Sequence, residues 1–175
     1  LLCMRLMSDE KRQKTDQLLL TSPVSITGLV MGKFLAALAI YAIGLAVTVV
    51  YAIILSFFAT PEWAVIVGNI FGSLIMGAAM IAICLLISAC TESQIIAAIG
   101  GLAAMLMLWL LENVASLLPD SLSWLGNALS QLSFSSRYDN FCQGILNIGD
   151  VLFYISAIVV FLFFNVRVIE KRRWS

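Results

Sequence analysis

The run FLAALAIYAIGLAVTVVYAIILSFF, residues 34–58, decides the class of fold because it contains no charged side chain. A helix that crosses a hydrocarbon core of ~30 Å needs about 20 consecutive apolar residues, so this run is long enough. Three further apolar runs follow at residues 63–90, 95–118 and 151–167. They are continuously apolar rather than alternating, which predicts spanning helices and not the strands of a membrane barrel. We therefore expect an all-α membrane protein with four transmembrane helices in this chain.

The composition favours the same class. Hydrophobic residues make up 62% of the chain and charged residues 11%, whereas soluble domains carry about 25% charged residues. The formal net charge is zero, so the overall charge gives no reason to expect a nucleic acid as partner. Without histidine, and without paired acids in the apolar runs, the sequence offers no metal site, proton relay or catalytic residue. The chain begins LLCMRLM, which we interpret as a fragment that lacks its N-terminal part.

The distribution of basic residues predicts the orientation. Only ATPE separates the first two runs and only TESQ the next two, so each pair forms an antiparallel hairpin. With four spans, both chain ends lie on one side of the membrane, and nine of the ten Lys and Arg residues fall on that side. The positive-inside bias makes this side the cytoplasm. The nine residues are Arg5, Lys11, Arg12, Lys14, Lys33, Arg167, Lys171, Arg172 and Arg173.

Residues 1–33 read as a polar cytoplasmic helix followed by an interfacial elbow. Residues 8–17 have no apolar side chain, yet most of them favour helix. One helix from Pro23 to Phe58 would be ~54 Å long, far more than the ~30 Å core. We therefore expect a short helix along the interface that bends at Gly28 or Gly32 into the first span, with Lys33 as an interfacial charge. The motif GLVMGKF lacks the spacing of a phosphate loop.

Residues 119–150 form the long outer connection. Leu122, Leu125, Leu129 and Leu132 recur at spacings of three and four, which predicts an amphipathic extracellular helix. This helix either dips into the outer face of the membrane or packs on the spans. The residues after it contain Arg137, Asp139 and Asp150. This following segment is either an interfacial loop that an ion pair between Arg137 and a carboxylate holds in place, or a substrate-gating element.

Polar residues within or near the spans are candidates for translocation or gating. They are Asn69, Glu112, Arg137 and Asp139. A charged residue deep in the membrane is by default a candidate for function. Glu112, however, lies only ~9 Å from the outer end of its span, where water can reach it. Small residues in the second run, including Gly68, Gly72 and Gly77, indicate a close helix contact, either inside the bundle or between subunits.

Three segments together resemble a known family. The run EKRQKTDQLLLTSPVSITGLVMGKFLAAL, the turn SACTESQIIAA and the C-terminal run from YDNFCQGILNIGD to VIEKRRW resemble type-2 ABC transporter permeases, in particular gliding-motility and nitrous-oxide-reductase-maturation permeases. The resemblance implies six spans in a complete subunit, of which this chain would lack the first and most of the second. Lys14 departs from the family pattern, which usually has glycine there. The resemblance places seven residues in the region that meets a separate ATPase subunit: Glu10, Lys11, Arg12, Thr15, Leu18, Leu19 and Pro23.

The resemblance also implies the function. The chain would be a permease subunit of an ABC exporter in the bacterial cytoplasmic membrane, paired with a second permease in a homo- or heterodimer. It would bind no cofactor itself, and ATP and Mg would be bound by the partner ATPase. The alternative is a non-transporting scaffold or assembly subunit whose polar helix recruits a soluble partner. The few polar residues in the spans, among them Thr48, Asn69 and Ser73, suit a lipid-like substrate as readily as a structural role.

Overall fold

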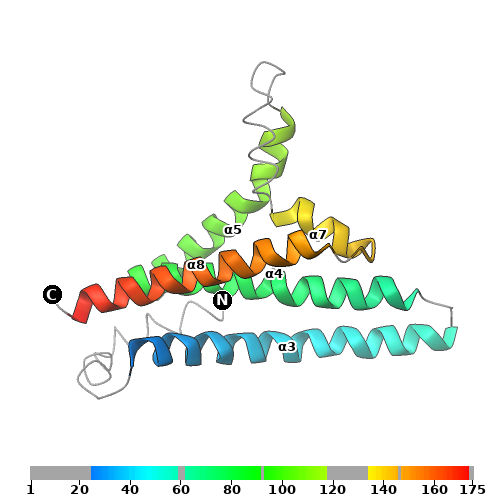
Figure 1. Ribbon diagram of the computed structural model, residues 1–175, viewed down its shortest axis with the longest axis horizontal. Coiled ribbons are helices and arrows are strands. Elements are labelled where there is room, and N and C mark those ends of the chain that lie inside the picture. Colours follow the sequence, from blue (N-terminus) through cyan, green and yellow to red (C-terminus); the bar gives the residue numbers. More distant parts are fainter. Residues whose placement is uncertain (1–24, 59–61, 92, 118–133, 146, 174–175) are drawn as a thin grey trace.

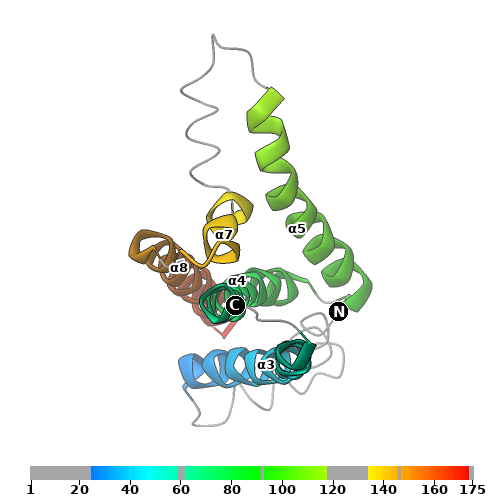
Figure 2. The same ribbon diagram turned by 90° about the vertical axis from the view of Figure 1, so that its right-hand side faces the viewer.

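The computed structural model describes residues 25–58, 62–91, 93–117, 134–145 and 147–173, and within these ranges it is helical, without strands. The helices are α3 (Ile26–Phe58), α4 (Trp63–Cys90), α5 (Gln94–Leu117), α7 (Phe134–Cys142) and α8 (Ile148–Arg173). Helices α3, α4 and α8 run side by side, whereas α5 leaves them at a steep angle (Figure 1). Helices α3 and α7 lie on different sides of α4 (Figure 2). The all-α prediction is confirmed.

Three helices of the described residues are long and apolar enough to cross a membrane: α3, α4 and the stretch Ile148–Lys171 of α8. The expected third span corresponds to α5, and the part of it whose side chains the structure describes, Gln94–Leu110, is a shorter apolar helix. The number of four spans therefore stays a prediction. Helix α8 begins before the expected residue 151 and continues to Arg173, so residues 168–173 extend the helix and are not a separate tail. The Asn147 side chain accepts a hydrogen bond from the backbone N–H of Gly149 at 3.1 Å, which helps to start the helix there.

The predicted elbow is wrong within the described residues, because α3 runs unbroken through Gly28 and Gly32. Ser25 caps the helix: its hydroxyl accepts a hydrogen bond from the Gly28 N–H at 3.3 Å. Val30, Phe34 and Ala37 are buried along one face of α3, with Val30 before Gly32 in the sequence and the other two after it. This continuous packing keeps the backbone helical and outweighs the ~1 kcal/mol that a glycine costs inside a helix.

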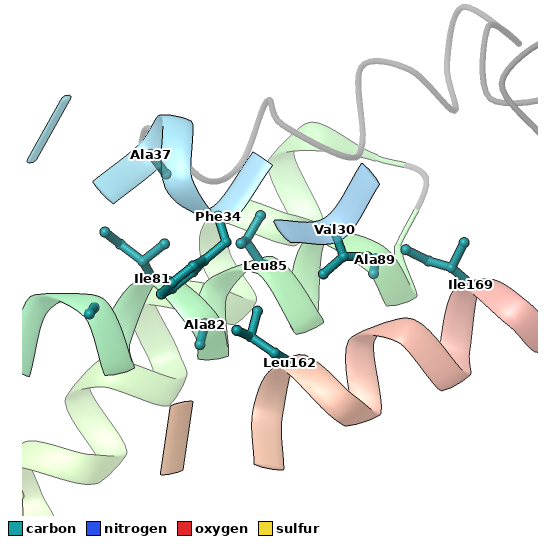
Figure 3. Packing of buried hydrophobic residues seen from close by; sticks show 10 residues of the cluster. Val30, Phe34, Ala37, Ile81, Ala82, Leu85, Ala89, Leu162 and Ile169 are labelled. Carbon is teal, nitrogen blue, oxygen red and sulfur yellow. The ribbon is translucent and has the colours of Figure 1, made fainter. Parts of the chain in front are cut away.

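The core is built on α4 and has two parts. One lies at the end of the bundle that carries Lys33 and Arg167, where side chains from α3, α4 and α8 meet (Figure 3). It contains Val30, Phe34, Ala37, Ala78, Ile81, Ala82, Leu85, Ala89, Leu162 and Ile169. The other lies at the opposite end, where α7 joins α4 and α8, and contains Ile75, Ala79, Ile83, Phe134, Phe141 and Tyr154. Small residues on α4 let its neighbours approach closely.

The glycines of α4 confirm that the small residues mark contacts inside the bundle. A Cβ added at Gly72 would lie 2.6 Å from the Cβ of Phe141, and one at Gly68 would lie 3.0 Å from the Phe141 carbonyl oxygen. A Cβ at Gly77 would collide with the ring of Tyr41 on α3. Helix α7 therefore rests directly on the backbone of α4, in the segment for which the sequence leaves open an interfacial loop or a substrate-gating element.

We expect Gly72→Ala to lower the stability of the bundle by about 1–3 kcal/mol, because the added methyl group pushes Phe141 and α7 away from α4. Thermal unfolding in detergent, followed by circular dichroism or differential scanning fluorimetry, measures this effect. Gly44→Ala is the matched control, since a Cβ at Gly44 meets nothing within 4 Å. Equal melting temperatures for the two variants would contradict the close contact between α4 and α7.

Candidate functional site

A set of polar side chains joins α7 to α4 and α8 at the end of the bundle opposite Lys33. We call this set the outer polar cluster. Its members are Asn69 and Ser73 of α4, Arg137, Tyr138 and Asn140 of α7, and Asp150 of α8. Asn69 and Ser73 are four residues apart and Arg137 and Asn140 three apart, so each pair shares one face of its helix.

An ion pair forms the half of the cluster that joins α7 to α8. A guanidinium nitrogen of Arg137 lies 2.8 Å from one carboxylate oxygen of Asp150, and the Asn140 amide donates to the other oxygen at 2.8 Å. Asp150 is only 4% exposed and stands in the first turn of α8, where the helix dipole favours a negative charge. The Arg137 guanidinium also lies 4.3 Å from the centre of the Phe153 ring. Both oxygens of the buried carboxylate are therefore satisfied.

Tyr138 makes the half that joins α7 to α4. Its hydroxyl donates to the side-chain oxygen of Asn69 at 2.6 Å and lies 2.8 Å from the hydroxyl of Ser73. Burial raises the pKa of the Tyr138 hydroxyl, so the group stays a neutral donor at ordinary pH. The Tyr41 hydroxyl of α3 donates to the backbone carbonyl of Ser73 at 3.1 Å. Ser73 thus links three helices.

Aromatic side chains also hold α7 in place against α4 and α8. The buried Tyr154 hydroxyl donates to the backbone carbonyl of Phe134, where α7 begins. The Phe134 ring meets the rings of Phe153 and Tyr154 edge to face, at centroid distances of 5.4 Å and 5.5 Å. At the other end of α7, Phe141 is fully buried against Gly72. Helix α7 is therefore held at both of its ends.

A pocket of about 460 Å³ opens between α3 and α4 beside the outer polar cluster. Its α3 wall comes from the second half of that helix, whose side chains are mostly exposed, whereas the buried residues of α3 all lie in the first half. Asn69 and Ser73 belong to both the cluster and the pocket. The lining residues are Leu45, Thr48, Tyr51, Ala52, Ile54, Leu55, Phe58, Ile66, Asn69, Ile70 and Ser73.

The structure brings together two of the four candidates for translocation or gating. Asn69 and Arg137 are joined through the outer polar cluster, whereas Asp139 lies on the exposed side of α7 and takes no part in it. Glu112 belongs to α5, and its side chain lies outside the described residues. Gly28, Gly32 and Lys33 lie in the first turns of α3. The expected polar helix, the amphipathic helix of residues 122–132 and the seven ATPase-contacting residues also lie outside the described residues: Glu10, Lys11, Arg12, Thr15, Leu18, Leu19 and Pro23.

The tie between Arg137 and a carboxylate is confirmed, although the segment that carries Arg137 is a helix and not a loop. Sequence reasoning missed Tyr138 and Asn140 as members of the site. The spacings of three and four residues between polar side chains were the available signal, but they do not show which helices meet.

Asn165 of α8 is a second residue that sequence reasoning missed. It is fully buried, and among the described residues neither its amide nitrogen nor its side-chain oxygen has a hydrogen-bond partner. Such a group costs about 1–3 kcal/mol, and a polar residue inside a membrane helix is by default a candidate for function. A single asparagine within the run FLFFNV, which is otherwise apolar, was the available signal.

The long apolar helices packed around α4 define a multi-pass membrane protein. A family model described as ABC-2 family transporter protein matches residues 1–169. The chain belongs to this family, the type-2 ABC transporter permeases, and is a membrane permease of an ABC transporter. Membership implies association with an ABC ATPase subunit. No curated protein and no solved structure gave a significant match.

We expect Arg137→Gln to destabilise the protein by about 3 kcal/mol, because it leaves the buried carboxylate of Asp150 without its cation. The melting temperature should fall by roughly 10 °C. The double variant Arg137→Gln/Asp150→Asn should recover most of this loss, since no uncompensated charge remains. Asp139→Asn, an exposed change on the same helix, is the control. An Arg137→Gln variant as stable as Asp139→Asn would contradict the importance of the pair.

We expect Asn165→Leu to raise the melting temperature by a few degrees, because it removes two unsatisfied polar atoms from the interior at similar volume. Ser156→Leu, which changes an exposed polar residue of the same helix, should have little effect. The same thermal unfolding experiment compares them. A lower melting temperature for Asn165→Leu would show that Asn165 is hydrogen-bonded in the membrane-embedded protein.

Proposed function

We propose that the chain is the membrane-spanning subunit of an ABC exporter that moves its substrate with energy from ATP hydrolysed on a separate ATPase subunit. The observation that carries the proposal is the family match over residues 1–169. In this proposal ATP and Mg are bound by the ATPase partner. The permease pairs with a second permease subunit, identical or different, in a bacterial cytoplasmic membrane.

The distribution of basic residues between the two ends of the bundle supports one orientation of the chain in the membrane. Lys33 lies near the start of α3, and Arg167 and Lys171 lie near the end of α8, at the same end of the bundle (Figure 1). Arg137 lies at the other end, where its charge is neutralised by Asp150. The positive-inside bias then places the Lys33 end in the cytoplasm, with α5 as a further span. On this topology both ends of the chain are cytoplasmic.

The ATPase-contacting surface is proposed to be the polar segment that precedes α3. Glu10, Lys11 and Arg12 would supply charges, and Thr15, Leu18, Leu19 and Pro23 would connect them to the membrane. Helix α3 begins at Ile26, only three residues after Pro23, and continues without a break to Phe58. A movement of the polar segment would therefore act on the whole of α3, and not on a separate elbow.

Gating is proposed for the outer polar cluster. Helix α7 bridges α4 and α8 through Tyr138, Arg137 and Asn140 on the side that faces away from the cytoplasm in this orientation. A separation of α4 from α8 at that end requires these bonds to break. Asn69 and Arg137 are the gating residues of this proposal. Asp139, which is exposed, is not needed for it.

Replacing residues 9–17 with a Gly/Ser linker of equal length should abolish co-purification with the cognate ATPase, because the charged surface is removed. Membrane insertion should be unchanged, since no apolar run is touched. Replacing residues 94–96 at the start of α5 with alanines is the control and should leave ATPase binding intact. Retained ATPase binding after the linker replacement would overturn the assignment of the contact surface. ATP-dependent flux in vesicles that contain both subunits separates a transporter from a scaffold.

A further inference from the structure

The pocket between α3 and α4 has the lining of a site for a hydrocarbon chain. Of its eleven lining residues, seven are wholly apolar: Leu45, Ala52, Ile54, Leu55, Phe58, Ile66 and Ile70. The other four carry neutral polar groups, and none is charged. Its volume of about 460 Å³ falls in the range of roughly 300–1,000 Å³ that is usual for ligand pockets.

The volume and lining of the pocket suit a slender apolar occupant. A single flexible hydrocarbon chain can follow this apolar lining, and each CH₂ group buried there favours binding by about 0.8 kcal/mol.

Asn69 supplies a polar contact at the edge of this apolar space. Its side-chain oxygen accepts hydrogen bonds from Tyr138 at 2.6 Å and from Ser73 at 3.4 Å. This arrangement leaves the amide nitrogen as a donor, and the described residues provide it with no acceptor. An unsatisfied N–H group at the edge of a hydrocarbon environment is unfavourable, so a ligand that brings an acceptor is stabilised there.

The depth of Asn69 fits the polar end of a lipid chain. Helix α4 ends at Cys90, near the basic end of the bundle. The rise from Cys90 back to Asn69 is ~32 Å along the helix, close to the ~30 Å thickness of the hydrocarbon core. With the basic end at one membrane interface, Asn69 lies at the other interface, at the boundary between hydrocarbon chains and headgroups.

The charges near the pocket favour a neutral group of the ligand as the acceptor for the Asn69 amide. Arg137, the cation in the outer polar cluster, is already paired with Asp150. A free carboxylate would therefore be desolvated in the pocket without a cation, which is costly. A neutral ester carbonyl accepts from the Asn69 amide without that cost. We propose that the pocket between α3 and α4 binds one ester-linked acyl chain of a bilayer phospholipid, whose ester carbonyl accepts a hydrogen bond from the Asn69 amide.

Photocrosslinking tests the location of this site. The full chain is reconstituted in nanodiscs that contain a phosphatidylcholine with a diazirine in its acyl chain, and labelled peptides are identified by mass spectrometry. Label should concentrate on the lining residues of α3 and α4. Ala52→Trp, which fills the pocket, should reduce this label several-fold, whereas Ala46→Trp, on an exposed position of the same helix, should not. Equal labelling of the two variants would overturn the proposal.

The role of Asn69 is tested by comparing ester-linked and ether-linked forms of the same phospholipid as competitors of the label. The ether form lacks the carbonyl, so it should compete about fivefold less well with the original protein. In Asn69→Leu, the two forms should compete equally. A merely structural effect of Asn69→Leu would weaken both forms alike and preserve the difference between them, which would overturn the assigned hydrogen bond.

Two further outcomes are decisive. Labelling of the pocket by a diazirine fatty acid but not by the phospholipid would overturn the choice of an ester-linked chain. The measurement uses the permease chain without ATPase or ATP, so it is independent of transport. A labelled pocket in a protein that shows no ATP-driven flux would uphold the lipid site while the proposed function failed.

Discussion

The small side chains of α4 are the constraint on which the rest of the described structure depends. Helices α3, α5, α7 and α8 all contact α4. In a membrane, helices gain little from hiding apolar surface from one another because lipid tails are equally apolar, so close packing has to supply the attraction. Gly68 and Gly72 allow α7 to pack against the backbone of α4. Gly77 leaves room for the ring of Tyr41. The alanines between Ala78 and Ala89 allow α3 and α8 to approach closely.

The outer polar cluster follows from that packing. A short helix such as α7 carries polar side chains that need partners at the edge of an apolar bundle. The close packing of α7 against Gly72 brings Tyr138 within hydrogen-bonding distance of Asn69 and Ser73. The same packing brings Arg137 to the first turn of α8, where Asp150 is stabilised by both the guanidinium and the helix dipole. Steric fit and hydrogen bonding therefore specify the same position for α7.

Much of the fold follows from the sequence alone, because the length of an uninterrupted apolar run limits what it can form. The boundaries of α4, Trp63 and Cys90, agree with the expected residues 63–90. The elbow was wrong because Gly28 and Gly32 were judged by local propensity and core thickness, whereas tertiary contacts of Val30 and Phe34 decide the backbone. Helix α7 was missed for a related reason. Its nine residues are few and largely polar, and its stability comes from partners that are distant in sequence.

The site was predicted only in part, for the same physical reason. Arg137 and Asn69 were identifiable because a cation and an amide are rare in this chain, and the pairing of Arg137 with a carboxylate is confirmed. The bond between Tyr138 and Asn69 spans 69 residues of sequence, so no local pattern predicts it. Asn165 was visible as an exception in an apolar run, but its lack of partners depends on how α8 is rotated against α3 and α4.

The two ends of the bundle are held together by different kinds of interaction, and this determines where they can separate. At the Lys33 end, α3, α4 and α8 share one apolar cluster, so moving any of them creates a cavity. At the other end, separating α4 from α8 breaks the hydrogen bonds of Tyr138 and the buried pair of Asp150. The second half of α3 has no buried side chain and faces α4 across the pocket. Separation of α3 from α4 at that end therefore costs the least, and it enlarges the space beside Asn69.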